Sequence, residues 1–253
     1  MKRVLGRFIN RVGYKTIGFT LTSYEVILFM SISILNILNP RHYNSYIYTR
    51  FITQIYQTSI KTIPHFIIVA AVFGSTLIGL LIVLAANFNL QVQIGALIVT
   101  FVINEFASLL TAFFIAYRFS PLIHIQASAF NFENETQELN NLVIPRILST
   151  VISTISLSIL FSLIMISGAY LFIFFIIGMD LHTYKSLIFS SLTVHNIFIL
   201  LSKSTLFGFI VAVLPLYKGL QILKYKHNTS KIFIILFFVE LLSLLALKAL
   251  HAI

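Results

Sequence analysis

The chain has 253 residues, of which 58% are hydrophobic and 9% are charged, and its mean hydropathy is +0.98. Soluble domains carry about 25% charged residues, so this composition predicts an integral membrane protein and excludes an ordinary soluble enzyme. Lys and Arg outnumber Asp and Glu by 17 to 7, and the absence of cysteine excludes disulfides, thiolate metal sites and cysteine nucleophiles.

Residues 1–60 are expected to form a basic N-terminal segment that contains one apolar stretch, residues 17–38. Five cations precede the stretch, Arg41 and Arg50 follow it, and no small-residue cleavage site ends it, so it does not resemble a signal peptide. If it crossed the membrane, the N-terminal cations would lie outside, against the positive-inside rule. We therefore expect an interfacial helix on the cytoplasmic face, with Glu25 and the Ser and Thr residues on its wetter side, and a sixth span is the alternative.

Residues 61–253 are expected to form an all-α transmembrane domain of five helices, because five apolar runs approach or exceed the roughly 20 residues that cross the hydrocarbon. The segments on one side of these runs hold nearly all of the Lys and Arg residues. That asymmetry places this side and the N-terminus in the cytoplasm and the C-terminus outside. The outer loop between the third and fourth spans has room for a short surface helix. The expected spans are residues 64–87, 93–117, 146–178, 194–217 and 232–250.

Small residues recur every four positions in the first two spans and predict close helix packing there. They are Ala71, Ser75 and Gly79 in the first span and Ser108, Ala112 and Ala116 in the second.

Residues 119–144, between the second and third spans, form the only long polar stretch between spans. The stretch is acidic, yet its cytoplasmic position agrees with the positive-inside rule because carboxylates count little in that rule. It is interpreted either as a solvated connector or as a short helix that docks on a cytoplasmic partner.

Lys203 stands in a long apolar run and is the clearest functional candidate. A charge at mid-membrane depth costs about 2.5–3.5 kcal/mol on insertion scales, so such a residue usually faces a partner, a water-filled cavity or a substrate path. Glu105 in the second span and Glu240 in the fifth occupy a similar depth, and we expect Glu105 to lie near Lys203. The alternative is that Lys203 snorkels to the interface.

No catalytic or metal-binding pattern is present in the sequence. The seven histidines are scattered, and His65 and His195, at expected span entrances, are interpreted as structural. No P-loop pattern occurs, so any ATP-driven activity needs a second polypeptide. The chain is therefore expected to hold no catalytic residue, metal, cofactor or nucleic acid of its own.

Two short motifs in the fourth span are shared with a known family. They are Lys203-Ser204-x-x-Phe207-Gly208 and Tyr217-Lys218-Gly219. This pattern resembles the MlaE-type permease family, the membrane subunits of ABC transporters that move phospholipids between bacterial membranes together with MCE-domain proteins. Glu105 and Arg118 match positions in that family's second span, and Pro145-Arg146 resembles the Pro-Arg that opens its third.

The resemblance implies a homodimeric permease of the bacterial inner membrane with a lipid cavity at the dimer axis. It implies an ABC ATPase on the cytoplasmic face, which uses the ATP, and an MCE-domain protein on the periplasmic face. Asn104, Glu105 and Lys203 would lie along the phospholipid path, where Lys203 could attract an anionic headgroup. A short segment between the second and third spans would contact the ATPase. The residues of this coupling segment are Glu133, Glu135, Thr136, Gln137, Glu138 and Leu139.

A non-ABC membrane protein is the alternative function. It would be an ion-coupled carrier that relays protons through Glu105, Lys203 and Glu240, or a structural membrane subunit.

Overall fold

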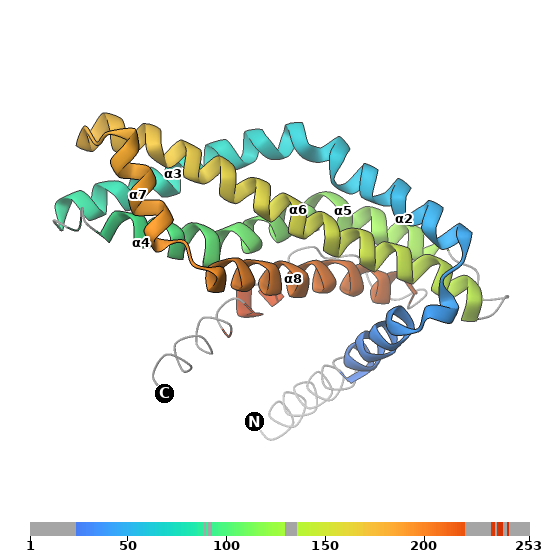
Figure 1. Cartoon of the computed structure of the whole chain (residues 1–253). Helices are drawn as coiled ribbons and strands as arrows, with labels where there is room; N and C mark the ends of the chain where they lie inside the picture. Colours follow the sequence, from blue (N-terminus) through green and yellow to red (C-terminus); the bar gives the residue numbers. More distant parts are fainter. Residues whose placement is uncertain are drawn as a thin grey trace, which may run out of the picture.

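The computed structural model describes residues 24–88, 90, 93–129 and 136–220, together with residues 234, 235, 237–239 and 242. These residues are almost entirely helical, and no strand occurs among them (Figure 1). In chain order the helices are Tyr24–Leu38, α2 (Ser45–Thr58), α3 (Ile63–Asn87), α4 (Ile94–Ile98), the π-helical segment η4 (Val99–Phe106), α5 (Ala107–Ser128), α6 (Thr136–Ile177), α7 (Leu181–Ser191) and α8 (Val194–Leu220), and the short 3-10 turns η1 (Pro40–His42) and η2 (Ile60–Thr62) flank α2.

Four stretches of helix in the described part of the chain are long and apolar enough to cross a membrane, and each contains one of the first four expected spans to within a residue. They are Ser45–Asn87, Ile94–Ser128, Leu139–Ile177 and Val194–Leu220. Most of the expected fifth span lies outside the described residues, so the count of five spans and the interfacial position of the N-terminal helix stay predictions.

The helix ends follow local chemistry where the sequence predicts them. Pro64 stands in the first turn of α3, where its missing N–H costs no hydrogen bond. α6 is followed by Gly178 at φ +73°, a left-handed conformation that glycine adopts without a steric penalty. The Asp180 carboxylate then accepts a hydrogen bond from the backbone N–H of His182 and begins α7 in the expected outer loop.

The helices extend further than expected at the end of the bundle opposite α7. α5 continues beyond Arg118 to Ser128, and α6 begins at Thr136, so residues 119–128 and 136–144 are helical rather than a polar connector. Burial explains the extension of α5: Phe119, Ile123 and Ala127 form an apolar stripe that packs in the core. Hydropathy identifies only the part of a helix that lies in the hydrocarbon, whereas these helices continue past the hydrocarbon and also pack against one another there.

α8 packs against both α5 and α6, and α6 also contacts α2 and α3 (Figure 1). Glycines on α8 allow the close approach. A Cβ at Gly208 would lie 2.8 Å from the Cα of Val151 on α6, and a Cβ at Gly219 would lie 2.6 Å from the carbonyl oxygen of His124 on α5. α4 precedes α5 in the chain and α7 precedes α8. Because α4 contacts α7 at the other end of the bundle, α5 and α8 run in the same direction.

One of the two small-residue stripes packs as predicted. Ser108, Ala112 and Ala116 are fully buried, whereas Ala71 and Ser75 on α3 are exposed. The prediction for α3 is therefore wrong for Ala71 and Ser75, because the main buried stripe lies one residue earlier. Gly79, by contrast, is half-buried, and a Cβ there would lie 3.3 Å from the Phe172 ring of α6. The main buried stripe is Phe66, Ala70, Gly74, Ile78 and Ile82.

The Tyr24–Leu38 helix is held to the ends of α6 and α8. The Tyr217 hydroxyl donates a hydrogen bond of 2.6 Å to the Glu25 carboxylate, and Asn36 Nδ2 donates one of 3.0 Å to Asn140 Oδ1. Ser33 is buried. The expectation that Glu25 and the Ser and Thr residues lie on the wetter side of this helix is therefore wrong for Ser33. Glu25 and Ser31 are exposed, and Glu25 stays so while it bonds to Tyr217.

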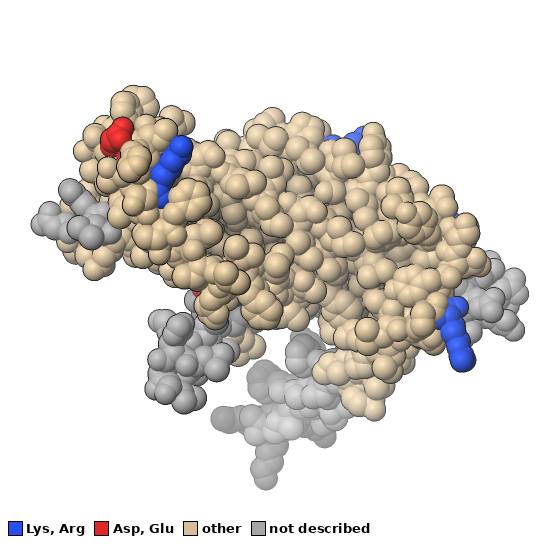
Figure 2. Space-filling view, in the orientation of Figure 1, with Lys and Arg blue, Asp and Glu red and all other residues tan. Residues whose placement is uncertain are grey.

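The face of the molecule seen in Figure 2 carries few charged side chains between its two ends. Large apolar residues of α3, including Ile68, Phe73 and Leu80, are more than half exposed. Such a surface is costly in water and favourable in lipid, as expected for an integral membrane protein.

Candidate polar site within the helix bundle

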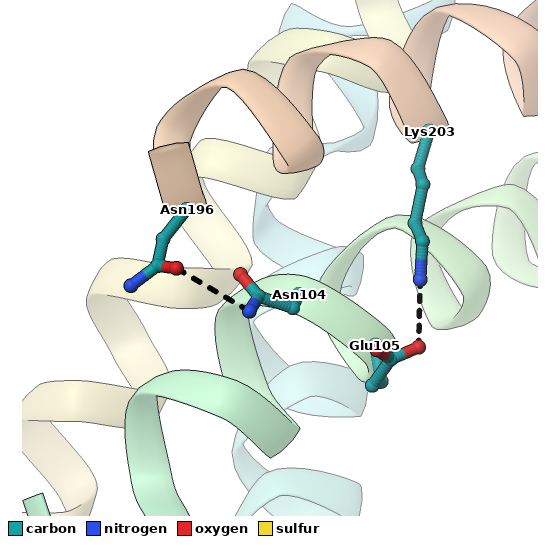
Figure 3. A network of polar contacts seen from close by, with 4 residues as sticks. All are labelled: Asn104, Glu105, Asn196 and Lys203. Atoms are coloured by element: carbon teal, nitrogen blue, oxygen red, sulfur yellow. Dashed lines mark hydrogen bonds and ion pairs between the residues drawn. The ribbon is translucent and has the colours of Figure 1, made fainter. Parts of the chain in front are cut away.

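Lys203 of α8 and Glu105 of η4 form an ion pair inside the bundle (Figure 3). The distance between Lys203 Nζ and Glu105 Oε2 is 2.6 Å, and the two side chains are 6% and 16% exposed. The predicted proximity of these residues is confirmed, and the ammonium group does not snorkel away from its helix. Glu240, the other candidate carboxylate, lies outside the described residues.

The ion pair is electrically neutral as a unit, which changes what Lys203 offers to a ligand. An anionic headgroup at Lys203 would have to compete with the Glu105 carboxylate, which already holds the ammonium at hydrogen-bond distance. Removing either partner would leave a buried charge without compensation, which typically costs about 3–5 kcal/mol. The pair therefore joins η4 to α8 and provides a polar point in an apolar span.

Asn104, the neighbour of Glu105, joins the same two elements through a second polar contact (Figure 3). Its Nδ2 donates to Asn196 Oδ1 at 3.4 Å, and Asn196 Nδ2 donates to the carbonyl oxygen of Ser191 at 3.1 Å. Since a carbonyl only accepts, Ser191 fixes the orientation of the Asn196 amide, and Asn196 in turn fixes that of Asn104. Sequence reasoning missed Asn196, whose only signal is an amide in the first turn of an apolar span.

Both Asn104 and Glu105 lie on π-helical backbone, which sequence reasoning did not predict. In η4 each N–H reaches the carbonyl five residues earlier, so residues five apart lie above one another. Phe101 and Phe106 accordingly stack, with ring centroids 6.3 Å apart and planes at 19°. In an α-helix these positions would diverge by about 140°. Because π-helical turns occur frequently at functional sites, η4 adds support to this location.

The coupling residues that the structure describes lie away from this site. Glu133 and Glu135 lie outside the described residues, and Thr136, Gln137 and Glu138 form the first turn of α6. Leu139 packs partly buried against the core. This turn lies at the end of the bundle opposite α7, whereas Glu105 and Lys203 lie between the two ends.

Arg146 is a second buried cation, which sequence reasoning noted only as part of a motif. Its side chain is 1% exposed, and its Nε and Nη2 atoms have no hydrogen-bond partner among the described atoms. One turn along α6, Ser149 donates to Gln54 of α2 at 3.2 Å. α6 and α2 therefore meet through buried polar groups.

The expected histidine positions agree with the structure. His65 lies in the first turn of α3 and His195 in the first turn of α8. Within the described ranges no three His, Cys, Asp or Glu side chains gather into a group that could hold a metal ion.

The sequence profile of the family described as permease MlaE matches residues 51–234 of this chain. No curated protein matches the chain. The matched residues include α3 to α8 and so both halves of the Lys203–Glu105 ion pair. Because the match covers well over half of the sequence, the chain belongs to the MlaE permease family.

Proposed function

We propose that this chain is the permease subunit of an ABC-type transporter that moves phospholipid between the inner and outer membranes of a bacterial envelope. Membership of the MlaE permease family indicates a membrane permease component of a lipid transporter. Four apolar helices support the membrane location, and the chain itself is not an enzyme in this proposal.

The observation that carries the proposal is the Lys203–Glu105 ion pair, which lies within an apolar span and within the residues that match the family. Charged residues at membrane depth typically mark substrate pathways. In the proposed path, Asn104, Glu105 and Lys203 interact with the phospholipid headgroup while the acyl chains stay among apolar side chains. Lys203 can bind a phosphate only by sharing its ammonium with Glu105, so binding would loosen the contact between η4 and α8.

The remaining parts of the machine are proposed from the family and the charge pattern. Most of the Lys and Arg residues in the described part of the chain lie at the end of the bundle opposite α7, including Arg41, Arg118 and Lys218, so this end is assigned to the cytoplasm. There the first turn of α6 would contact an ABC ATPase, which hydrolyses the ATP. α7 would face the periplasm and an MCE-domain protein, and a second copy of the chain would complete the lipid cavity. The chain would be a multi-pass inner-membrane protein with a cytoplasmic N-terminus and a periplasmic C-terminus.

Affinity purification in mild detergent tests the assembly. We expect an ATPase, an MCE-domain protein and phospholipid to copurify with the tagged chain. Recovery of the intact chain without an ATPase and without an MCE-domain protein would contradict the proposal.

Transport assays with substituted proteins test the path. Lys203→Ala is expected to lower phospholipid transfer between donor and acceptor vesicles while the complex still assembles. Lys61→Ala is the matched control, because Lys61 is exposed at η2 and lies outside the proposed path. Equal transfer by the two variants would remove Lys203 from the mechanism.

A further inference from the structure

α2 presents an aromatic face to its surroundings. Tyr48, Ile52 and Tyr56 follow one another at intervals of four residues and are 67%, 47% and 56% exposed. Tyr46 on the same helix is 47% exposed as well. Residues four apart share one side of a helix, so Tyr48, Ile52 and Tyr56 form a continuous stripe.

The opposite side of α2 makes the contact with α6. The buried residues of α2 are Ile47, Gln54 and Thr58, and Gln54 accepts a hydrogen bond from Ser149 of α6. The rest of the helix surface is largely exposed and combines the tyrosines with polar side chains, among them Thr49, Thr53 and Gln57. Such a mixture of large rings and polar groups is typical of a helix at the membrane interface rather than of one in the hydrocarbon.

Helix length indicates which part of the bilayer α2 meets. α2 and α3 together span 43 residues, about 65 Å at 1.5 Å per residue, whereas the hydrocarbon core is about 30 Å thick. α3 alone has 25 residues, about 37 Å, and suffices for the crossing. The 3-10 turn η2 separates the two helices, and Figure 1 shows a bend between them.

The distribution of charged residues distinguishes α2 from α3 in the same way. α3 contains no Asp, Glu, Lys or Arg, whereas Arg50 lies on α2 and Arg41 and Lys61 flank it. The Arg50 guanidinium lies 4.8 Å from the centroid of the Tyr46 ring. Tyrosine rings and cations together are typical of the membrane interface, where the ring meets acyl chains and the charge meets phosphate.

We propose that α2 lies in the headgroup layer of the membrane, with the stripe formed by Tyr48, Ile52 and Tyr56 in contact with lipid. Arg50 lies beside anionic phosphates, and the hydrocarbon begins at α3. α2 is thereby a lipid-binding surface that sets the depth of the bundle in the membrane. This inference holds whether or not the chain transports phospholipid.

Fluorescence quenching tests the depth directly, because the chain contains no tryptophan and a single substitution introduces a single fluorophore. Tyr48→Trp and Tyr56→Trp report on α2, and Phe73→Trp on α3 is the control, with the same 56% exposure as Tyr56. Each full-length variant is reconstituted into vesicles of phosphatidylcholine and phosphatidylglycerol. The vesicles carry a nitroxide on the headgroup, bromines near the acyl carbonyls, or bromines near the bilayer centre.

We expect the α2 variants to be quenched most by the headgroup nitroxide and the shallow bromines, and Phe73→Trp to be quenched most by the deep bromines. Strongest quenching of the α2 variants by deep bromines would place α2 in the hydrocarbon and overturn the proposal. Water-like emission with no quenching would overturn it in favour of an aqueous extension. Blue-shifted emission with no quenching would overturn it in favour of a protein partner covering α2.

Discussion

Replacing Lys203 and Glu105 one at a time and then together gives the sharpest test of the site. Lys203→Met leaves a carboxylate that is 16% exposed, and Glu105→Leu leaves an ammonium that is 6% exposed. Each single substitution should destabilise the protein by about 3–5 kcal/mol, because the remaining buried charge loses its compensation. Replacing both residues removes both charges, so the double variant should be near the wild-type stability or above it by about 1–4 kcal/mol.

Unfolding of the purified protein in detergent, driven by heat or by SDS, measures this difference. The four proteins form a double-mutant cycle, which isolates the interaction between the two side chains. Lys61→Met serves as the control for loss of a surface lysine, with an expected change within about 0.5 kcal/mol. Additive effects of the two substitutions would refute the reasoning, because they would mean that the two groups do not compensate each other.

Three further predictions concern the packing around this site, each measured by the same unfolding assay. Asn196→Leu should destabilise the protein by about 1–3 kcal/mol, because Asn104 loses its acceptor and the Ser191 carbonyl loses its donor. Arg146→Met should not destabilise the protein, because two guanidinium nitrogens of Arg146 have no acceptor among the described atoms. A loss of stability above about 3 kcal/mol would instead indicate a carboxylate partner elsewhere in the chain. Gly208→Val should cost about 1–3 kcal/mol by overpacking against α6, whereas Gly168→Ala, with no atom within 4 Å of the added Cβ, should be neutral or stabilising.

Hydropathy located the apolar parts of the helices well and their ends poorly. The starts of α3 and α8 agree with the expected spans to within a residue, because a proline or a change in polarity marks them. α5 and α6 extend about ten residues beyond the expected limits. A helix that continues into water carries polar residues on its outer side, so its composition resembles a connector unless the packing partner of the inner side is known.

The amino-acid sequence alone determined the membrane class, the family motif around Lys203 and the need for a partner to that charge, because each depends on composition or on residues close in the chain. The identity of the partner depended on the tertiary structure, since Glu105 lies 98 positions from Lys203 and only the parallel packing of α5 and α8 brings them together. The same holds for the buried face of α3 and for the π-helical backbone of η4. A periodic pattern offers several faces and registers of similar local energy, and contact with the neighbouring helices selects one of them.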